Sequence, residues 1–442
     1  MINALDDKKY VVVCSDNLEL LRSLPDNSID SMVTDPPSGI AFMGHEWDKD
    51  KGDRDAWIEW LCVIMKEALR VLKPGAHGLV WSLPRTSHWT ATALENAGFE
   101  IRDRIDHIFG SGFPKSHDIS KACDRMAGAE REVVGRDPYY SAGSTKNFGD
   151  GNKYGTAKGG DEETAFVTAP ATDEARQWQG WGTALKPAHE DWILVRKPFP
   201  GTVAANVKEW GTGGINIDGC RVGLSGARNN GNSKGTIGSN SIGVYGKAIK
   251  QDYNKGRFPA NIIHDGSDEV LAIFPQSKRQ QGDVAGTEQS HTGQGNCYGD
   301  YDRIPSAKRN DNGSAARFFY CAKPSKSEKN AGLDMLEELH KSDSYREPTG
   351  NVLVDRLPGC GNKTQNHHPT VKAMALCQYL CRLITPPGGV VLDMFMGSGS
   401  IGCGAVTEGF RYIGCDNVPE YVQISDLRIR YWLEQPRQEN LL

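Results

Sequence analysis

The sequence lacks the patterns that mark membrane, secreted and zinc-binding proteins. No apolar run approaches the roughly 18 residues needed to cross a bilayer, and no apolar signal segment follows Met1. None of its 11 cysteines forms a CxxC pair, so neither a disulfide framework nor a zinc cluster is favoured. We therefore expect a cytoplasmic protein with reduced thiols, no metal and no membrane partner.

A strong excess of one charge is also missing. The 442 residues carry a formal net charge of -5, with 38% hydrophobic and 24% charged residues, which does not match a disordered chain. Residues 199–330 nevertheless hold 17 Lys and Arg against 12 Asp and Glu, a balance of +5 that leaves -10 for the rest. An anionic partner such as nucleic acid and a mildly basic solvated surface both fit this partition.

Glycine divides the chain into regular ends and a loop-rich middle, because 30 of the 50 glycines lie between Ala127 and Asn330. At the ends, short apolar runs alternate with amphipathic stretches, which predicts an α/β fold: a doubly wound, mostly parallel sheet with crossover helices. The predicted strands are 10–14, 29–35, 78–83, 99–109, 189–197, 390–395 and 412–416. The predicted helices are 17–24, 55–72, 89–97, 370–384, 400–408 and 419–433, and Lys73-Pro74-Gly75 is expected to end the second.

A glycine turn follows a predicted strand near the C-terminus. Residues 397–402 read Gly-Ser-Gly-Ser-Ile-Gly and open a predicted helix, and Asp416 ends the next strand. This pattern suits an adenosine cofactor, whose ribose hydroxyls a strand-end carboxylate can bind. Both a nicotinamide dinucleotide and S-adenosylmethionine carry that ribose, but Asp393 just before the turn suits the latter better. Only about 40 residues follow Gly402, so the other strands must come from the N-terminal half in a circularly rearranged sheet.

A second special turn, Asp35-Pro36-Pro37-Ser38, follows the predicted strand 29–35. Neither proline can donate a ladder hydrogen bond, so the strand ends there and presents a fixed carboxylate and a proline carbonyl at the edge of the sheet. The chain here resembles the exocyclic-amine DNA methyltransferases, whose hallmark is Asp/Ser/Asn-Pro-Pro-aromatic. The order of catalytic turn, long variable module and cofactor turn resembles their β group, and so do the segments 15–30, His368 to Lys372 and 385–389.

The resemblance implies a Rossmann-like fold, S-adenosylmethionine as cofactor, and double-stranded DNA as partner, with base flipping as in restriction-modification enzymes. An aromatic exocyclic amine is a poor nucleophile, and Asp35 and the Pro36 carbonyl can each accept one of its hydrogens during direct methyl transfer. No cysteine follows a proline, which speaks against a covalent cytosine-C5 mechanism. The implied catalytic residues are Asp35, Pro36, Pro37 and Ser38. The implied cofactor-binding residues are Asp16, Asp35, Thr370, Lys372, Asp393, Phe395, Gly397, Ser398, Gly399, Asp416 and Asn417.

One position departs from the family hallmark. Ser38 stands where the family has an aromatic residue that stacks on the flipped base, an interaction of about 1 to 3 kcal/mol. Either Phe42 or Trp47 on the same loop replaces it, or the base is held less tightly. A catalytically silent DNA-binding protein is a third reading.

The domain boundaries follow from the same features. We expect a catalytic half at 1–126, a Gly/Ser-rich insertion at 127–186, a returning strand at 187–198, a target recognition module at 199–330 and a cofactor-binding half at 331–442. In that module Arg257 and Arg317 are candidates for phosphate contact. The resemblance also implies a homodimer, which could align two basic modules along the duplex.

The expected activity is therefore methylation of an exocyclic amine in DNA. Adenine N6 is favoured because Asp begins the catalytic turn, and cytosine N4, where Ser is more usual, is the alternative. An RNA methyltransferase stays open within the same chemistry. A nicotinamide-dependent oxidoreductase would explain the glycine turn but not Asp35-Pro36-Pro37.

Overall fold

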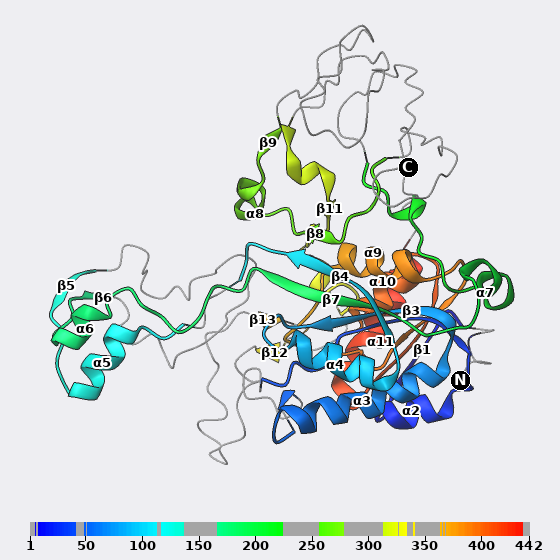
Figure 1. The fold of residues 1–442 in the computed structure, drawn as a ribbon, viewed down its shortest axis with the longest axis horizontal. Helices are drawn as coiled ribbons and strands as arrows, with labels where there is room; N and C mark the ends of the chain where they lie inside the picture. Colours follow the sequence, from blue (N-terminus) through cyan, green and yellow to red (C-terminus); the bar gives the residue numbers. More distant parts are fainter. Residues whose placement is uncertain are drawn as a thin grey trace, which may run out of the picture. The chain divides into compact units, whose positions relative to one another are not determined.

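The computed structural model describes residues 5, 8–40, 48–49, 51–112, 116–136, 166–223, 256–277, 313–325, 327–333, 339–340, 363–364, 366 and 368–435. The chain divides into two compact units (Figure 1). The first joins Met1–His107 to Glu190–Leu442, and the second is Ile108–His189. In the described residues, no helix has both the length and the apolar character that a membrane span requires.

A nine-stranded sheet forms the centre of the first unit. Its strands, in sheet order, are β1 (Tyr10–Cys14), β15 (Arg411–Asp416), β14 (Val390–Asp393), β2 (Ile29–Thr34), β3 (Leu72–Ser82), β7 (His189–Arg196), β4 (Glu100–Ile108), β8 (Ile262–His264) and β11 (Tyr320–Cys321). The strands from β1 to β3 pair in parallel, whereas β7 runs antiparallel to β3. Strands from the two ends of the sequence therefore alternate in one sheet, which confirms the mostly parallel α/β fold and its rearranged order.

Helices cover both faces of this sheet (Figure 1), so two apolar cores form. One face carries α2 (Asn17–Ser23), α3 (Arg54–Val71) and α4 (Ser87–Ala97), and the other carries α9 (Met374–Ile384), α10 (Ser400–Thr407) and α11 (Pro419–Glu434). Alternation along β14 shows the division: Val390 and Leu392 join the first core and Val391 joins the second. A sheet buried on both faces explains why these strands read as continuous apolar runs.

Most predicted elements are present with ends shifted by a few residues. The second helix ends just before Lys73-Pro74-Gly75, as expected, but the strand that follows it starts six residues earlier than predicted. Helix α3 ends at Val71, and β3 begins at Leu72 and runs through these three residues. The pairing of β2 with β3 shifts register there, from Ile29 opposite Leu72 to Ser31 opposite His77. This irregularity accommodates the proline, which cannot donate to the ladder.

The described part of residues 199–330 contributes more than loops. It supplies β8 and β11 to the edge of the large sheet, together with α7 (Val203–Trp210), η4 (Asp218–Cys220), α8 (Asp268–Ile273), η6 (Ala315–Phe318) and η7 (Ser327–Lys329). Two short antiparallel pairs also form, β9 (Gln276–Ser277) with β10 (Gly313–Ser314) and β12 (Leu339–His340) with β13 (Lys363–Thr364). The domain boundaries given above stay a prediction.

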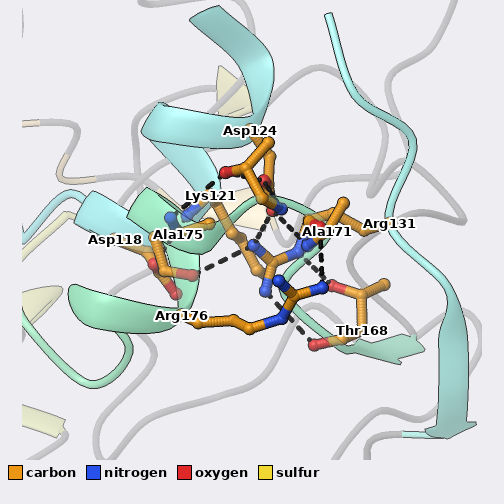
Figure 2. Close-up of polar contacts among 10 residues, drawn as sticks. Asp118, Lys121, Asp124, Arg131, Thr168, Ala171, Ala175 and Arg176 are labelled. Atoms are coloured by element: carbon orange, nitrogen blue, oxygen red, sulfur yellow. Dashed lines mark hydrogen bonds and ion pairs between the residues drawn. The ribbon is translucent and has the colours of Figure 1, made fainter. Parts of the chain in front are cut away.

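The second unit is built around one buried carboxylate. It contains α5 (Ile119–Ala127), α6 (Asp173–Gln177) and the hairpin of β5 (Val133–Arg136) with β6 (Phe166–Thr168). Asp124 accepts hydrogen bonds from Ala171 N at 3.0 Å and from Thr172 N and Oγ1 at 2.9 and 2.8 Å, and it pairs with Arg131. Figure 2 shows Arg131 between Asp124 and Thr168, where its Nε donates to the threonine hydroxyl at 2.9 Å. These contacts tie α5, the hairpin and α6 together.

Candidate active site

Three acidic residues end adjacent parallel strands at one edge of the large sheet. Asp393 is the last residue of β14 and Asp416 the last of β15, and Asp35 directly follows β2. Because these strands are neighbours in the order β15, β14, β2, their carboxyl ends meet at the same edge. Ligands of open α/β sheets bind at this edge, so the two turns singled out in the sequence lie side by side.

Asp393 links the two turns. Its side chain is fully buried and accepts hydrogen bonds from Thr34 Oγ1 at 2.8 Å, Phe395 N at 3.2 Å and the Tyr412 hydroxyl at 3.2 Å. Burial raises the pKa of Asp393 to about 7, and these donors only partly oppose that effect. This carboxyl group therefore connects β2, β14 and β15.

The glycine turn between β14 and α10 depends on glycine at two positions. Gly397 has φ of +50° and Gly399 of +72°, a region that residues with a Cβ rarely adopt. A Cβ on Gly397 would also lie 2.6 Å from the ring of His368, and one on Gly399 would lie 2.6 Å from Ser425. His368 in turn packs edge-on against Tyr421 with ring centroids 4.5 Å apart. His368 lies in one of the segments that resemble the family, but neither ring is among the predicted site residues.

Asp416 fixes the backbone of the glycine turn. Its two oxygens accept hydrogen bonds from Gly397 N at 3.0 Å and Val418 N at 2.9 Å. Burial raises the pKa of Asp416, and the backbone donors oppose it. On the edge strand β1, Cys14 lies opposite Asp416, and Ser15 N donates to the Asp416 carbonyl at 3.1 Å, which brings the next residue, Asp16, to this end of the sheet.

The remaining cofactor candidates surround this turn. Asp16 caps α2 by accepting from Leu18 N at 2.8 Å, and Asn417 is exposed just beyond β15. Ser398 is buried with its hydroxyl 3.4 Å from that of Ser400, and Phe395 packs against Trp60 with centroids 5.9 Å apart. Thr370 N donates to His368 Nδ1 at 3.3 Å. The structure thus brings the predicted set, apart from Asp35 and Lys372, around one glycine turn.

Lys372 lies on the catalytic side of the site. Its Nζ is 3.1 Å from Asp35 Oδ2 and 3.3 Å from Glu190 Oε2, and it stands 4.4 Å from the centre of the Trp81 ring. Glu190 is the second residue of β7, and because β7 is antiparallel to β3, its first residues reach the edge where the parallel strands end. The residue pattern of 189–197 does not indicate the direction of the strand, so Glu190 is absent from the predicted site residues.

Burial and charge act against each other in this cluster. Burial raises the pKa of Asp35 to about 6 although the nearby Lys372 lowers it. Burial also raises the pKa of Glu190, but Lys372 and hydrogen bonds from His107 and Trp81 bring it well below its usual range. The pKa of Lys372 is raised by the two carboxylates although burial lowers it. Near neutral pH the cluster therefore holds one ammonium and two carboxylates.

Ser38 forms hydrogen bonds within the protein. It is buried, and its hydroxyl donates to both oxygens of Asp48 at 3.0 Å, while Ser38 N and Gly39 N also donate to Asp48. Thr86 Oγ1 donates to the Ser38 carbonyl at 3.0 Å. Asp48, which the sequence did not single out, thus fixes the end of the Asp35-Pro36-Pro37-Ser38 turn. The candidates Phe42 and Trp47 lie outside the described residues.

The site can be compared with known proteins. Residues 247–426 match the model of a family described as DNA methylase, the N6/N4 methyltransferases. A segment of 99 residues is 31% identical to the type II methyltransferase M.BamHI of Bacillus amyloliquefaciens, covering 22% of this chain and 23% of the relative. A segment of 123 residues is 28% identical to the type II methyltransferase M2.DpnII of Streptococcus pneumoniae, covering 28% of this chain and 40% of the relative.

These matches span less than half the length of either curated relative. Among solved structures, the PvuII DNA methyltransferase, described as cytosine-N4-specific, aligns with a TM-score of 0.41 and 13% identity over 95% of this chain and 86% of that one.

Proposed function

We propose that this chain transfers a methyl group from S-adenosylmethionine to an exocyclic amine of a base in double-stranded DNA, because residues 247–426 match the N6/N4 DNA methylase family. This match confirms the resemblance to the exocyclic-amine DNA methyltransferases and supports S-adenosylmethionine as the cofactor. The activity of this whole chain, its substrate base and its partners are the proposal.

One observation carries the proposal: the Asp35 turn and the glycine turn are joined through a single buried carboxyl group. Thr34, the residue before Asp35, donates to Asp393, which lies four positions before Gly397 of the glycine turn. A methyl donor held at the glycine turn would therefore lie beside the carboxylate that receives the amine. Such fixed proximity is what direct group transfer requires.

The residues present fit an adenosine-containing cofactor. Gly397 and Gly399 keep the turn free of side chains, and Asp416 lies at the end of the next strand, where a carboxylate can reach a ribose. Bound S-adenosylmethionine would supply the methyl group as an electrophilic sulfonium. We assign its binding to the predicted residues around this turn.

Asp35 and the Pro36 carbonyl would act on the amine. By accepting its two hydrogens they favour a pyramidal nitrogen, whose lone pair forms the new N–C bond as the methyl carbon leaves sulfur. The amine then loses one proton, and the Asp35 carboxylate is placed to receive it before water does. Stabilisation of this kind contributes several kcal/mol to a transition state.

We further propose adenine N6 as the target atom, because an aspartate begins the catalytic turn. The base must leave the duplex stack at a cost of a few kcal/mol. The Ser38 side chain is hydrogen-bonded to Asp48 and has no aromatic ring to stack on a base. We therefore assign stacking to an aromatic residue elsewhere, with Phe42 and Trp47 as candidates. Cytosine N4 is the alternative target.

For the DNA partner we propose residues 199–330 as the target recognition module, because the excess of positive charge lies in that segment. We propose a homodimer as the assembly, since it could align two such modules along the duplex. Arg317 lies 4.4 Å above the Phe318 ring and donates to the carbonyls of Gly313 and Ser314 at 2.6 Å, and Arg257 lies 4.8 Å above the same ring. These contacts order a basic and aromatic loop. Sedimentation with and without DNA tests the dimer, and a mass near 48.4 kDa in both cases would exclude it.

The activity is tested by incubating the protein with methyl-labelled S-adenosylmethionine and DNA or RNA of mixed sequence, followed by nucleoside analysis. We expect labelled N6-methyladenine from DNA. Labelled N4-methylcytosine would correct the base, label in RNA alone would correct the substrate, and no label in either would remove the proposed activity.

A further inference from the structure

Beyond the catalytic turn, a second buried carboxylate faces Asp35 across one ammonium group. Lys372 Nζ lies 3.1 Å from Asp35 and 3.3 Å from Glu190. The three side chains are 17%, 15% and 12% exposed for Asp35, Glu190 and Lys372, so water screens them weakly. The position of the ammonium group therefore depends on both carboxylates.

Glu190 is held more firmly than Asp35. Trp81 Nε1 donates to its Oε2 at 2.7 Å, and His107 Nδ1 lies 3.0 Å from its Oε1. Trp81, Glu190 and His107 belong to β3, β7 and β4, which are consecutive strands of the sheet. The rigid sheet thus fixes Glu190, Glu190 fixes Lys372, and Lys372 pairs with the carboxylate on the Asp-Pro-Pro turn.

We propose that Glu190 is a positioning residue for methyl transfer, which holds Lys372 so that the ammonium group orients the Asp35 carboxylate toward the amine of the base. This inference rests on the proposed function. Lys372 takes Asp35 Oδ2, so Oδ1 is the oxygen that we assign to the amine hydrogen.

The arrangement has a consequence for pH dependence. Asp35 is faced by Lys372, Glu190 and Asp48, and it also interacts with Asp393 across the sheet edge. Burial raises its pKa to about 6, and the negative charge of Glu190 adds to that effect. Activity that needs the Asp35 carboxylate should therefore fall as the pH drops below about 6.

A purely structural role for Glu190 makes a different prediction. If the ion pair with Lys372 only held β7 to the loop before α9, its loss would lower stability and turnover alike at every pH. The position of the acid limb of the rate profile separates the two roles, because it reports the charge that Asp35 experiences.

The first variant is Glu190→Gln, which keeps the size of the side chain and an oxygen for Trp81 and Lys372 while removing the charge. We expect the acid limb of kcat to move down by about one pH unit, since a negative charge no longer opposes ionisation of Asp35. The KM for S-adenosylmethionine should stay within about twofold, because Glu190 lies away from the glycine turn. An unmoved acid limb would overturn the inference.

Glu190→Asp keeps the charge but draws Lys372 back by about one carbon–carbon bond length. We expect kcat to fall about tenfold through lost positioning while the acid limb stays in place. Should Glu190→Gln fail to fold, this variant decides alone, and wild-type kcat in Glu190→Asp would contradict the positioning role.

Glu408→Gln is the matched control. Glu408 forms a pair of similar burial with Arg382, at 2.6 and 2.7 Å, between α10 and α9. Its loss should lower thermal stability without moving the acid limb. The wild-type protein is measured first: if it methylates no base, the proposed function and this inference fall together, whereas an active wild type with an unmoved limb in Glu190→Gln removes only this inference.

Discussion

Two buried carboxylates, one in each unit, differ in how completely the chain satisfies them. Asp124 in the second unit accepts three hydrogen bonds from Ala171 and Thr172 and pairs with Arg131 (Figure 2). Asp35 in the first unit pairs with Lys372, which it shares with Glu190. Although burial raises the pKa of Asp124, its donors hold it at about 2, whereas the pKa of Asp35 is raised to about 6.

The difference follows from what each carboxylate is surrounded by. A carboxylate that accepts several fixed N–H and O–H groups is stabilised as an anion and joins the segments that donate to it. A carboxylate that is buried with fewer donors keeps an acceptor available and is less stable as an anion, which is a property of functional sites. We therefore assign a structural role to Asp124 and a role in the reaction to Asp35, and each assignment can be tested.

The largest expected effect is that of Asp35→Ala on methyl transfer. Loss of a charged acceptor that acts on the amine in the transition state should reduce kcat by at least about a hundredfold. S-adenosylhomocysteine affinity should stay within about threefold, because Asp35 lies beside the cofactor turn rather than in it. Single-turnover methylation and calorimetry measure the two quantities.

The matched control for that variant is Asp30→Asn on the same strand. Asp30 is also buried, pairs with Lys73 and accepts from Val390 N at 2.8 Å, but it lies at the opposite end of β2. The Asp30→Asn substitution should lower stability and leave kcat within a few-fold of the wild-type value. An Asp35→Ala protein that keeps more than about a tenth of wild-type turnover would be too active for the assigned role.

A smaller effect is expected at the glycine turn. Asp416→Ala removes the acceptor of Gly397 N and the carboxylate assigned to the ribose, so S-adenosylhomocysteine affinity should fall about tenfold or more. Calorimetry measures this, with NAD as the competing ligand, for which we expect no binding. Asp426→Ala on α11, which removes the partner of Tyr10 and Arg430, is the control. Tight NAD binding would contradict the cofactor assignment.

Local pattern was enough to predict the parts of the site that lie on one turn. Asp35-Pro36-Pro37 had to end a strand because proline cannot continue the ladder, and Gly397 and Gly399 had to bend the chain because other residues rarely adopt their φ values. The sheet edge that joins these turns followed from the alternation of strands and helices. The family resemblance supplied the cofactor, whereas the target base rests on a single residue type.

Local sequence pattern could not predict the contacts between segments that are distant in the chain. Glu190 reaches Lys372 because β7 runs antiparallel beside β3, and nothing in the residues 189–197 states that direction. Asp48 holds Ser38, which lies ten positions earlier in the chain, and the register shift that takes Pro74 into β3 depends on the partner strand. Burial, charge and pairing between segments decide these features, and they exist only in the folded chain.

The smallest effect on activity is expected from Asp124→Asn, and it completes the comparison. The pKa of Asp124 in the folded unit, about 2, lies below its usual value of 3.8, so its ionisation favours folding above about pH 4 and this contribution is lost as the pH falls toward 2. In the wild type, the protection of amides in residues 116–136 and 166–182, relative to an unfolded chain at the same pH, should therefore persist at pH 4 and be lost as the pH approaches 2. The asparagine variant cannot form the ion pair with Arg131, and its exchange in these segments should already be fast at neutral pH, with methylation of DNA within about threefold of wild type because no residue of the assigned site lies in this unit. Loss of methylation without faster exchange would reverse the assignment, since it would give Asp124 a part in chemistry and not in structure.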